Sequence, residues 1–145
     1  QAVLLTEGGR MIKTPTYHVM HMYRHHQGAE LLESALSGVD EIGVGEWKVP
    51  KITESVSVNE QGTITITMNN LSIEAAETVE IQFVERGYKV TEAKIVTNKD
   101  MHAHNTFEAP EEVVEADFAD YSMTDDGLSV NMPANSVVEI RVEKA

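Results

Sequence analysis

The sequence predicts a mainly β protein, an antiparallel β-sandwich of about seven to nine strands that follows a single strong helix. Two observations support this prediction. From Asp40 onward, apolar and polar residues alternate with a period of two in six stretches that are separated by turn-forming residues. Before that point, the stretch from Lys13 to Gln27 is the one strong helical signal.

Composition limits the kinds of partner that this protein can have. The net charge is −13, and residues 1–37 balance three basic against three acidic side chains, so residues 38–145 carry the whole excess with eight basic and twenty-one acidic ones. An acidic surface of this kind argues against nucleic acid and against anionic membranes as partners. The absence of cysteine excludes disulfides and Cys-zinc sites.

No targeting signal is recognisable. There is no apolar run of about 18 residues for a spanning helix and no signal-peptide pattern. Because the chain begins at Gln1 rather than Met, we expect a processed or truncated product. The compartment stays open between the bacterial cytoplasm and the periplasm or secretion.

The helix has recognisable boundaries. Thr14 fits an N-cap, and Pro15 fits the first helical position, where the missing N–H costs nothing. Gln27 is the expected last residue, and Gly28 is a plausible stop. A second short helical turn is expected over residues 29–36.

The segments around this helix have apolar surface to cover. The run from Ala2 to Thr6 fits a buried strand, which Gly8 and Gly9 would end in a turn. The helix is apolar on more than one side, unlike an ordinary surface helix. We therefore expect it either to fold back on the sandwich or to pack against another copy of the chain.

Each alternating stretch is predicted to be a strand with one buried face and one wet face. The stretches are residues 55–58, 63–68, 78–83, 92–95, 128–132 and 137–142. The expected turns lie at Asn59–Gly62, Asn69–Asn70, Arg86–Gly87, Asp125–Gly127 and Pro133–Asn135. Period and charge both change between Ser37 and Val44, so we place a boundary there that separates residues 1–38 from 39–145.

Two groups of histidines resemble metal sites. His18, His21 and His25 share one helix face, but the HExxH pattern is missing and the helix holds no carboxylate, so we interpret them as a packed or solvent-facing face. Asp100, His102, His104 and Glu108 form the second group, which we interpret as a polar loop held by Asn105 and Thr106. No metal and no cofactor is predicted.

The carboxylates have ordinary interpretations as well. Asn59–Glu60 looks like the Asn-Glu pair of many glycosidases, but a hairpin turn between two strands explains it fully. The acidic run from Glu108 to Asp120 is interpreted as a solvated, partly looped edge. Phosphate-binding loops and nucleophile elbows are absent from the sequence.

Two stretches resemble a known family. Residues 3–23, with the core Thr-Pro-Thr-Tyr-His-Val at 14–19 and Met22–Tyr23, closely resemble the end of the catalytic barrel in glycoside hydrolase family 51 α-L-arabinofuranosidases. Residues 100–107, Asp-Met-His-Ala-His-Asn-Thr-Phe, look like a motif of the C-terminal β-domain of the same enzymes. The two stretches occur in the family's order and at compatible spacing.

The resemblance implies a (β/α)8 barrel followed by a jelly-roll-like β-sandwich. Val3–Thr6 would then be the last barrel strand, residues 14–27 the last barrel helix, and residues 39–145 the sandwich. Residues 7–13 would form the loop on the active-site face of the barrel. Arg10, Met11 and Lys13 would therefore line the substrate cleft.

The resemblance also implies the reaction, which is retaining hydrolysis of terminal α-L-arabinofuranosyl groups from arabinan and arabinoxylan-type glycans by two carboxylates about 5–5.5 Å apart. Both are glutamates on earlier barrel strands, so no catalytic residue is assigned here, and the chain alone is expected to be inactive. The alternative is a carbohydrate-binding sandwich, for which the single tryptophan, Trp47, would be the stacking platform. A homo-oligomer is compatible with either interpretation.

Overall fold

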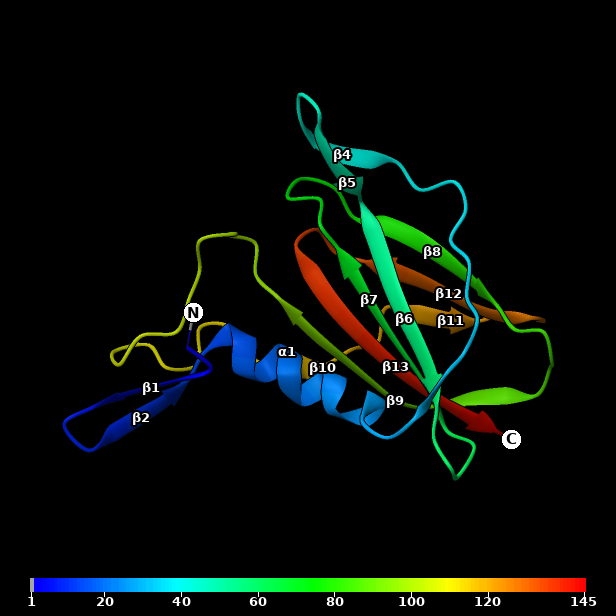
Figure 1. Cartoon of the computed structure of the whole chain (residues 1–145), viewed down its shortest axis with the longest axis horizontal. Helices are drawn as coiled ribbons and strands as arrows, with labels where there is room; N and C mark the ends of the chain where they lie inside the picture. Colours follow the sequence, from blue (N-terminus) through cyan, green and yellow to red (C-terminus); the bar gives the residue numbers. More distant parts are fainter. Residues whose placement is uncertain (1) are drawn as a thin grey trace.

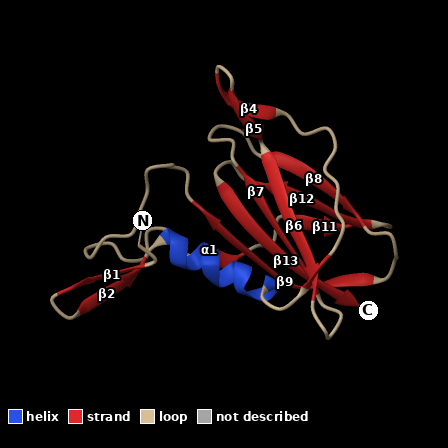
Figure 2. Ribbon diagram, in the orientation of Figure 1, coloured by secondary structure: helices blue, strands red, loops and turns tan. Residues whose placement is uncertain are grey.

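The computed structural model describes residues 2–145, and β-strands dominate it (Figures 1 and 2). A six-stranded and a three-stranded antiparallel sheet face each other as a sandwich, so the nine strands fall within the predicted range. The six-stranded sheet contains, in spatial order, β10 (Ala116–Asp117), β9 (Tyr88–Thr97), β13 (Ser136–Lys144), β7 (Ile64–Asn70), β6 (Ile52–Val58) and β3 (Glu30–Leu31). The three-stranded sheet contains β11 (Tyr121–Met123), β12 (Gly127–Met132) and β8 (Glu77–Gln82).

All six predicted strands are present, and their apolar positions form one core between the sheets. Leu128, Val130 and Met132 of β12 face Val138 and Ile140 of β13, and all five are fully buried. The two-residue period therefore places one apolar face of each sheet against the other, which is the main source of stability in a sandwich.

The predicted turns are confirmed with one exception. The side chain of Asn59 accepts hydrogen bonds from the amides of Gln61 and Thr63, so Asn59–Glu60 does belong to the hairpin turn between β6 and β7. Asn69 and Asn70 are not a turn but the end of β7. The Asn70 amide group is buried and donates to three backbone carbonyls, a role that sequence alone does not reveal.

The prediction of one wet face per strand is wrong for the middle of the six-stranded sheet. Thr63, Thr65 and Thr67 were expected in solvent, but they are 4%, 3% and 0% exposed, and Glu139 is 1% exposed. The helix and the turn after it lie across the outer face of this sheet and cover it (Figure 1). Strand β7 is therefore buried on both faces.

The N-terminal segment consists of β1 (Leu4–Glu7), β2 (Arg10–Lys13), α1 (Pro15–Tyr23) and the 3-10 helix η1 (Arg24–His26). Helix α1 begins at the predicted N-cap, but the Thr14 hydroxyl donates to backbone carbonyls of Ala2 and Val3 instead of capping the helix. The segment expected as a loop before the helix is largely strand β2, paired with β1 across the Gly8–Gly9 turn.

The expected second helical turn over residues 29–36 is wrong. Glu30–Leu31 forms the short strand β3, and the chain then continues as an extended strap, residues 32–39, along the open side of the sandwich (Figure 1). A hairpin that the sequence did not predict follows, with β4 (Glu41–Val44) paired to β5 (Trp47–Pro50). No helix within residues 2–145 is long and apolar enough to cross a membrane.

Candidate functional site

The two stretches that resemble the arabinofuranosidase family lie against each other. The buried side chain of Asn105 donates from Nδ2 to the carbonyl oxygens of Lys13 and Val113, at 2.9 Å each, and its Oδ1 accepts from the Val113 amide at 2.7 Å. The Thr106 hydroxyl accepts from the amide of Ala109. The interpretation of this stretch as a loop held by Asn105 and Thr106 is therefore confirmed, and Asn105 also ties the loop to the end of β2.

The three residues predicted for a substrate cleft all lie on β2. Arg10 pairs with Glu7, and its guanidinium group lies 4.6 Å from the centre of the Phe107 ring. The Lys13 ammonium group lies 4.6 Å from the centre of the Tyr17 ring, whereas the Met11 side chain is 60% exposed. Both cations are thus supported by aromatic rings, one from the loop and one from the helix.

The helix histidines bind the sandwich. His21 Nδ1 lies 2.7 Å from a carboxylate oxygen of Glu115, and His25 Nδ1 lies 2.5 Å from one of Glu139. His26 bonds through Nδ1 to the Ser57 hydroxyl at 2.7 Å and through Nε2 to the Thr67 hydroxyl at 3.0 Å. The carboxylates that the helix lacks are Glu115, just before β10, and Glu139 of β13, so both pairs join the helical segment to distant parts of the sandwich.

Apolar packing also holds the helix on the sandwich. Met22, which is fully buried, packs with Val96 and Val113 in a small second core, and Val19 and Val137 border it. Among residues 2–145, no group of three or more His, Cys, Asp or Glu side chains could hold a metal ion. Through His21 and His25 the histidine face packs against the sandwich, which is one of the two arrangements expected from sequence.

The buried carboxylate beneath the helix is not accessible as a hydrolase centre. Burial raises the pKa of the Glu139 carboxyl group, and the adjacent His25 opposes that shift. Burial lowers the pKa of His26 and of His18. A raised carboxyl pKa is what a general acid needs. However, only 2% of the Glu139 side chain is exposed and its carboxylate is in contact with His25, so no sugar can reach this carboxylate.

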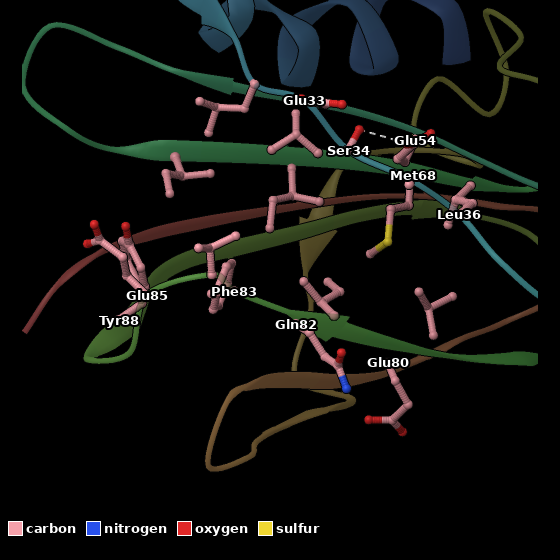
Figure 3. A pocket seen from close by; sticks show the side chains of 18 residues that line it. Glu33, Ser34, Leu36, Glu54, Met68, Glu80, Gln82, Phe83, Glu85 and Tyr88 are labelled. Carbon is pink, nitrogen blue, oxygen red and sulfur yellow. Dashed lines mark hydrogen bonds between the residues drawn. The ribbon is translucent and has the colours of Figure 1, made fainter.

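A cavity of 470 Å³ lies on the other side of the molecule, between the strap and the two sheets (Figure 3). Its walls include Val56, Met68 and Tyr88 from the six-stranded sheet and Phe83 just after β8 of the three-stranded sheet. Ser34 on the strap donates to Glu54 across its mouth. Nothing in the sequence pattern distinguished this cavity, because its lining residues alternate like those of any core strand.

The β4–β5 hairpin carries the remaining candidate residue. Trp47 is 87% exposed, and its cross-strand neighbour Val44 is 84% exposed, so both lie at the tip of a hairpin that projects from the sandwich (Figure 1). Trp47 is therefore accessible as a stacking platform.

Comparison with known proteins agrees with the two motifs. The model of the α-L-arabinofuranosidase C-terminal domain matches residues 1–136. The chain belongs to this domain family. The matched residues cover both motifs and eight of the nine strands of the sandwich, so the fold, the motifs and the family model agree.

Three of the similar proteins are named as arabinofuranosidases. The chain is 29% identical over 144 residues to an intracellular exo-α-L-arabinofuranosidase from Bacteroides ovatus. The match covers 99% of this chain and 28% of that protein. A crystal structure of the family 51 arabinofuranosidase from Xanthomonas axonopodis pv. citri superposes with a TM-score of 0.92 at 29% identity, over 99% of this chain and 29% of that one.

A family 51 α-L-arabinofuranosidase from Bifidobacterium longum shares the fold, with a TM-score of 0.87 at 20% identity over 98% of this chain and 28% of that one. The chain thus spans less than a third of the length of these relatives. It corresponds to their C-terminal domain and contains no catalytic barrel.

Proposed function

We propose that this domain belongs to an enzyme that removes terminal α-L-arabinofuranosyl groups from arabinan- or arabinoxylan-type glycans with retention, and that the 145-residue chain alone is inactive. Family membership and the activity named for the Bacteroides ovatus relative support the reaction. Retaining hydrolysis needs two carboxylates about 5–5.5 Å apart. We assign neither to this chain, and we assign its role to support of the catalytic part.

In this proposal, residues 1–38 are the end of the barrel, with Glu30–Leu31 adding strand β3 to the edge of the sandwich, and residues 39–145 form the rest of the sandwich. Apolar surface that the sandwich leaves uncovered supports the division. Leu4, Leu5, Met11 and Met20 are 41%, 39%, 60% and 57% exposed, and all four lie in the N-terminal segment. A protein surface packed against them would bury this apolar area.

The bond from Asn105 to the Lys13 carbonyl is the observation that carries the proposed role. It fixes the end of β2 to a loop of the sandwich, and Phe107 of the same loop supports Arg10. The sandwich would thereby hold Arg10, Met11 and Lys13 in place at the edge of a substrate cleft. A displacement of about 1 Å at such positions is enough to lower catalytic efficiency by orders of magnitude.

The test uses the longer polypeptide that contains the catalytic part and measures kcat and KM on an aryl α-L-arabinofuranoside. Arg10→Ala is expected to lower kcat/KM by roughly tenfold, through the loss of one positioned cation. Arg86→Ala is the matched control, because this arginine is exposed and pairs only with Asp126 on the far side of the sandwich. Equal kcat/KM values for the two variants would contradict the proposed cleft.

A second candidate function, carbohydrate binding by the sandwich, rests on the exposure of Trp47. Its indole ring could stack on a sugar ring of the polymer. Calorimetry of the chain with arabinan and with xylan tests it: saturable heat that disappears in Trp47→Ala and persists in Val49→Ala would support this function. The absence of heat with both polymers would remove it.

A further inference from the structure

Helix α1 places Tyr17 and His21 one turn apart on the same face. Their rings are stacked, with centroids 6.0 Å apart and an angle of 11° between the ring planes. A spacing of four residues brings two side chains together because 3.6 residues make one turn of an α-helix. The stack therefore reaches from the first turn of the helix, which follows β2, to its last turn.

One end of this stack meets Lys13, the last residue of β2. The main chain of Lys13 is fixed, because its carbonyl oxygen accepts from the Asn105 side chain. The long lysine stem is flexible, so the main chain alone does not determine where the ammonium group lies. That group lies 4.6 Å from the centre of the Tyr17 ring, whose face attracts a cation. The orientation of the Tyr17 ring therefore determines where the charge of Lys13 is held.

The other end of the stack meets Glu115, just before β10. Nδ1 of His21 lies 2.7 Å from a carboxylate oxygen of Glu115, and only 15% of the Glu115 side chain is exposed. An ionised carboxylate can only accept a hydrogen bond, so this contact requires the proton on Nδ1. Glu115 thereby sets both the tautomer and the orientation of the His21 ring.

Arg24 competes for the same ring nitrogen. Its Nη1 lies 2.8 Å from Nδ1 of His21 and also donates to the His21 carbonyl oxygen. A guanidinium group can only donate, so a bond from Arg24 to Nδ1 requires that this nitrogen carry no proton. An ionised Glu115 keeps the proton on Nδ1 and leaves Arg24 with the carbonyl oxygen. Removal of the carboxylate would let Arg24 donate to Nδ1, so the tautomer of His21 reports the influence of Glu115.

The charges at both ends of this chain of contacts act on one further side chain of the helix, His18. Burial lowers the pKa of His18, the Glu115 carboxylate opposes that shift, and the Lys13 ammonium group adds to it. Lys94 also acts on Glu115 but pairs with Asp117 at 2.7 Å. The carboxylate of Glu115 is therefore left to the helix.

We propose that Glu115 is a positioning residue for the reaction of the parent enzyme. Through His21 and Tyr17 it fixes the Lys13 ammonium group at the edge of the cleft, where this group donates hydrogen bonds to glycan hydroxyls. This inference rests on the proposed function, because the cleft belongs to it. The sandwich thus acts on β2 by two routes, since Asn105 fixes the backbone of Lys13 and Glu115 fixes its charge.

The first test follows two NMR signals in the 145-residue chain at about pH 8, where an ordinary histidine is neutral. The ring nitrogen shifts of His21 should show the Nδ1–H tautomer in the wild type and a shift toward the other tautomer in Glu115→Gln. The protons next to Lys13 Nζ should lie upfield, because they face the Tyr17 ring, and should lose part of that displacement in Glu115→Gln. A change in only one of the two signals, or in neither, would overturn the proposal.

Two variants calibrate these signals. Tyr17→Leu removes the ring and gives the Lys13 shifts without any displacement. Glu111→Gln is the matched control, because Glu111 is exposed on the same segment as Glu115, and it should change neither signal. An effect of Glu111→Gln equal to that of Glu115→Gln would show that the charge of the segment acts as a whole, and would overturn the role of Glu115.

The second test measures kcat and KM of the longer polypeptide on an arabinan-type oligosaccharide. Lys13→Met should lower kcat/KM by roughly tenfold through the loss of one cation. Glu115→Gln should lower it by about threefold, because the cation remains but is held less well. The double variant should be no slower than Lys13→Met, since Glu115 acts only through Lys13. Effects that multiply in the double variant, or no effect of Glu115→Gln, would overturn the proposal.

Failure of the proposed function would differ from failure of this inference. In the first case the wild-type longer polypeptide would hydrolyse no arabinofuranoside, while the NMR signals of the 145-residue chain would still respond to Glu115→Gln. In the second case the wild type would turn over substrate, and the effects of Lys13→Met and Glu115→Gln would be independent.

Discussion

The substitution Asn105→Ala tests how firmly the sandwich holds the N-terminal segment. Asn105 is 3% exposed, and its side chain makes three hydrogen bonds to the backbone of Lys13 and Val113. Alanine would leave those three backbone groups without their partner, and the Lys13 carbonyl would lose its tie to the loop. A satisfied hydrogen bond contributes about 1 kcal/mol, and an unsatisfied buried group costs about 1–3 kcal/mol.

We therefore expect the free energy of unfolding to fall by about 3 kcal/mol, since water can partly reach the Lys13 carbonyl once the side chain is shortened. Urea unfolding followed by circular dichroism measures this change, with an unaltered m-value as the check for two-state behaviour. Asn131→Ala is the matched control, because Asn131 is exposed and bonds only to Asp120 through its side chain, so a loss of under about 1 kcal/mol is expected.

A loss of under about 1 kcal/mol for Asn105→Ala, or equal losses for the two variants, would refute the reasoning that Asn105 joins the two parts. A loss confined to residues 2–27, seen as fast amide exchange there with the sandwich amides still protected, would support it in more detail. That pattern would show that the N-terminal segment detaches before the sandwich unfolds.

Two further predictions concern the packing of helix α1 on the sandwich. Met22→Ala should lower the free energy of unfolding by about 3 kcal/mol, because Met22 is fully buried. Met20 is 57% exposed on the same helix, so Met20→Ala should cost under about 0.5 kcal/mol in the same urea titration, and similar costs for the two variants would contradict the observed helix orientation. Because burial raises the pKa of Glu139, the folded state holds this proton more tightly, so its stabilising contribution is complete below pH 4.5 and is lost as pH rises through the folded pKa. Wild-type stability should thus decline relative to Glu139→Gln as pH rises above 4.5, and parallel pH profiles would refute this.

The sequence predicts the sandwich well because alternation is a direct consequence of strand geometry. Val138 and Ile140 face the core with one polar residue between them, and such a pattern has few other solutions. The expectation that polar positions face solvent fails at Glu139 and Thr67, which are buried because a helix from a distant part of the chain covers them. No local pattern reveals what will cover an outer face.

The candidate site was predictable in part. The family resemblance identified the stretches around Thr14 and Asn105, but the contact between them joins residues 92 positions apart and needed the structure. The short strand β2 and the β4–β5 hairpin were missed because four-residue strands give little periodicity. Asn70 was taken for a turn residue because asparagine favours turns, whereas here its buried amide group donates to three backbone carbonyls.

Hydrolysis of an aryl α-L-arabinofuranoside by the purified 145-residue chain tests the central claim most directly. The claim is that this domain supports a catalytic centre located elsewhere in its parent. We expect no turnover above the rate of the buffer blank, together with a folded circular dichroism spectrum and turnover by the longer parent polypeptide under the same conditions. Saturable turnover by the 145-residue chain itself would contradict the claim and would place a catalytic carboxylate pair within these residues.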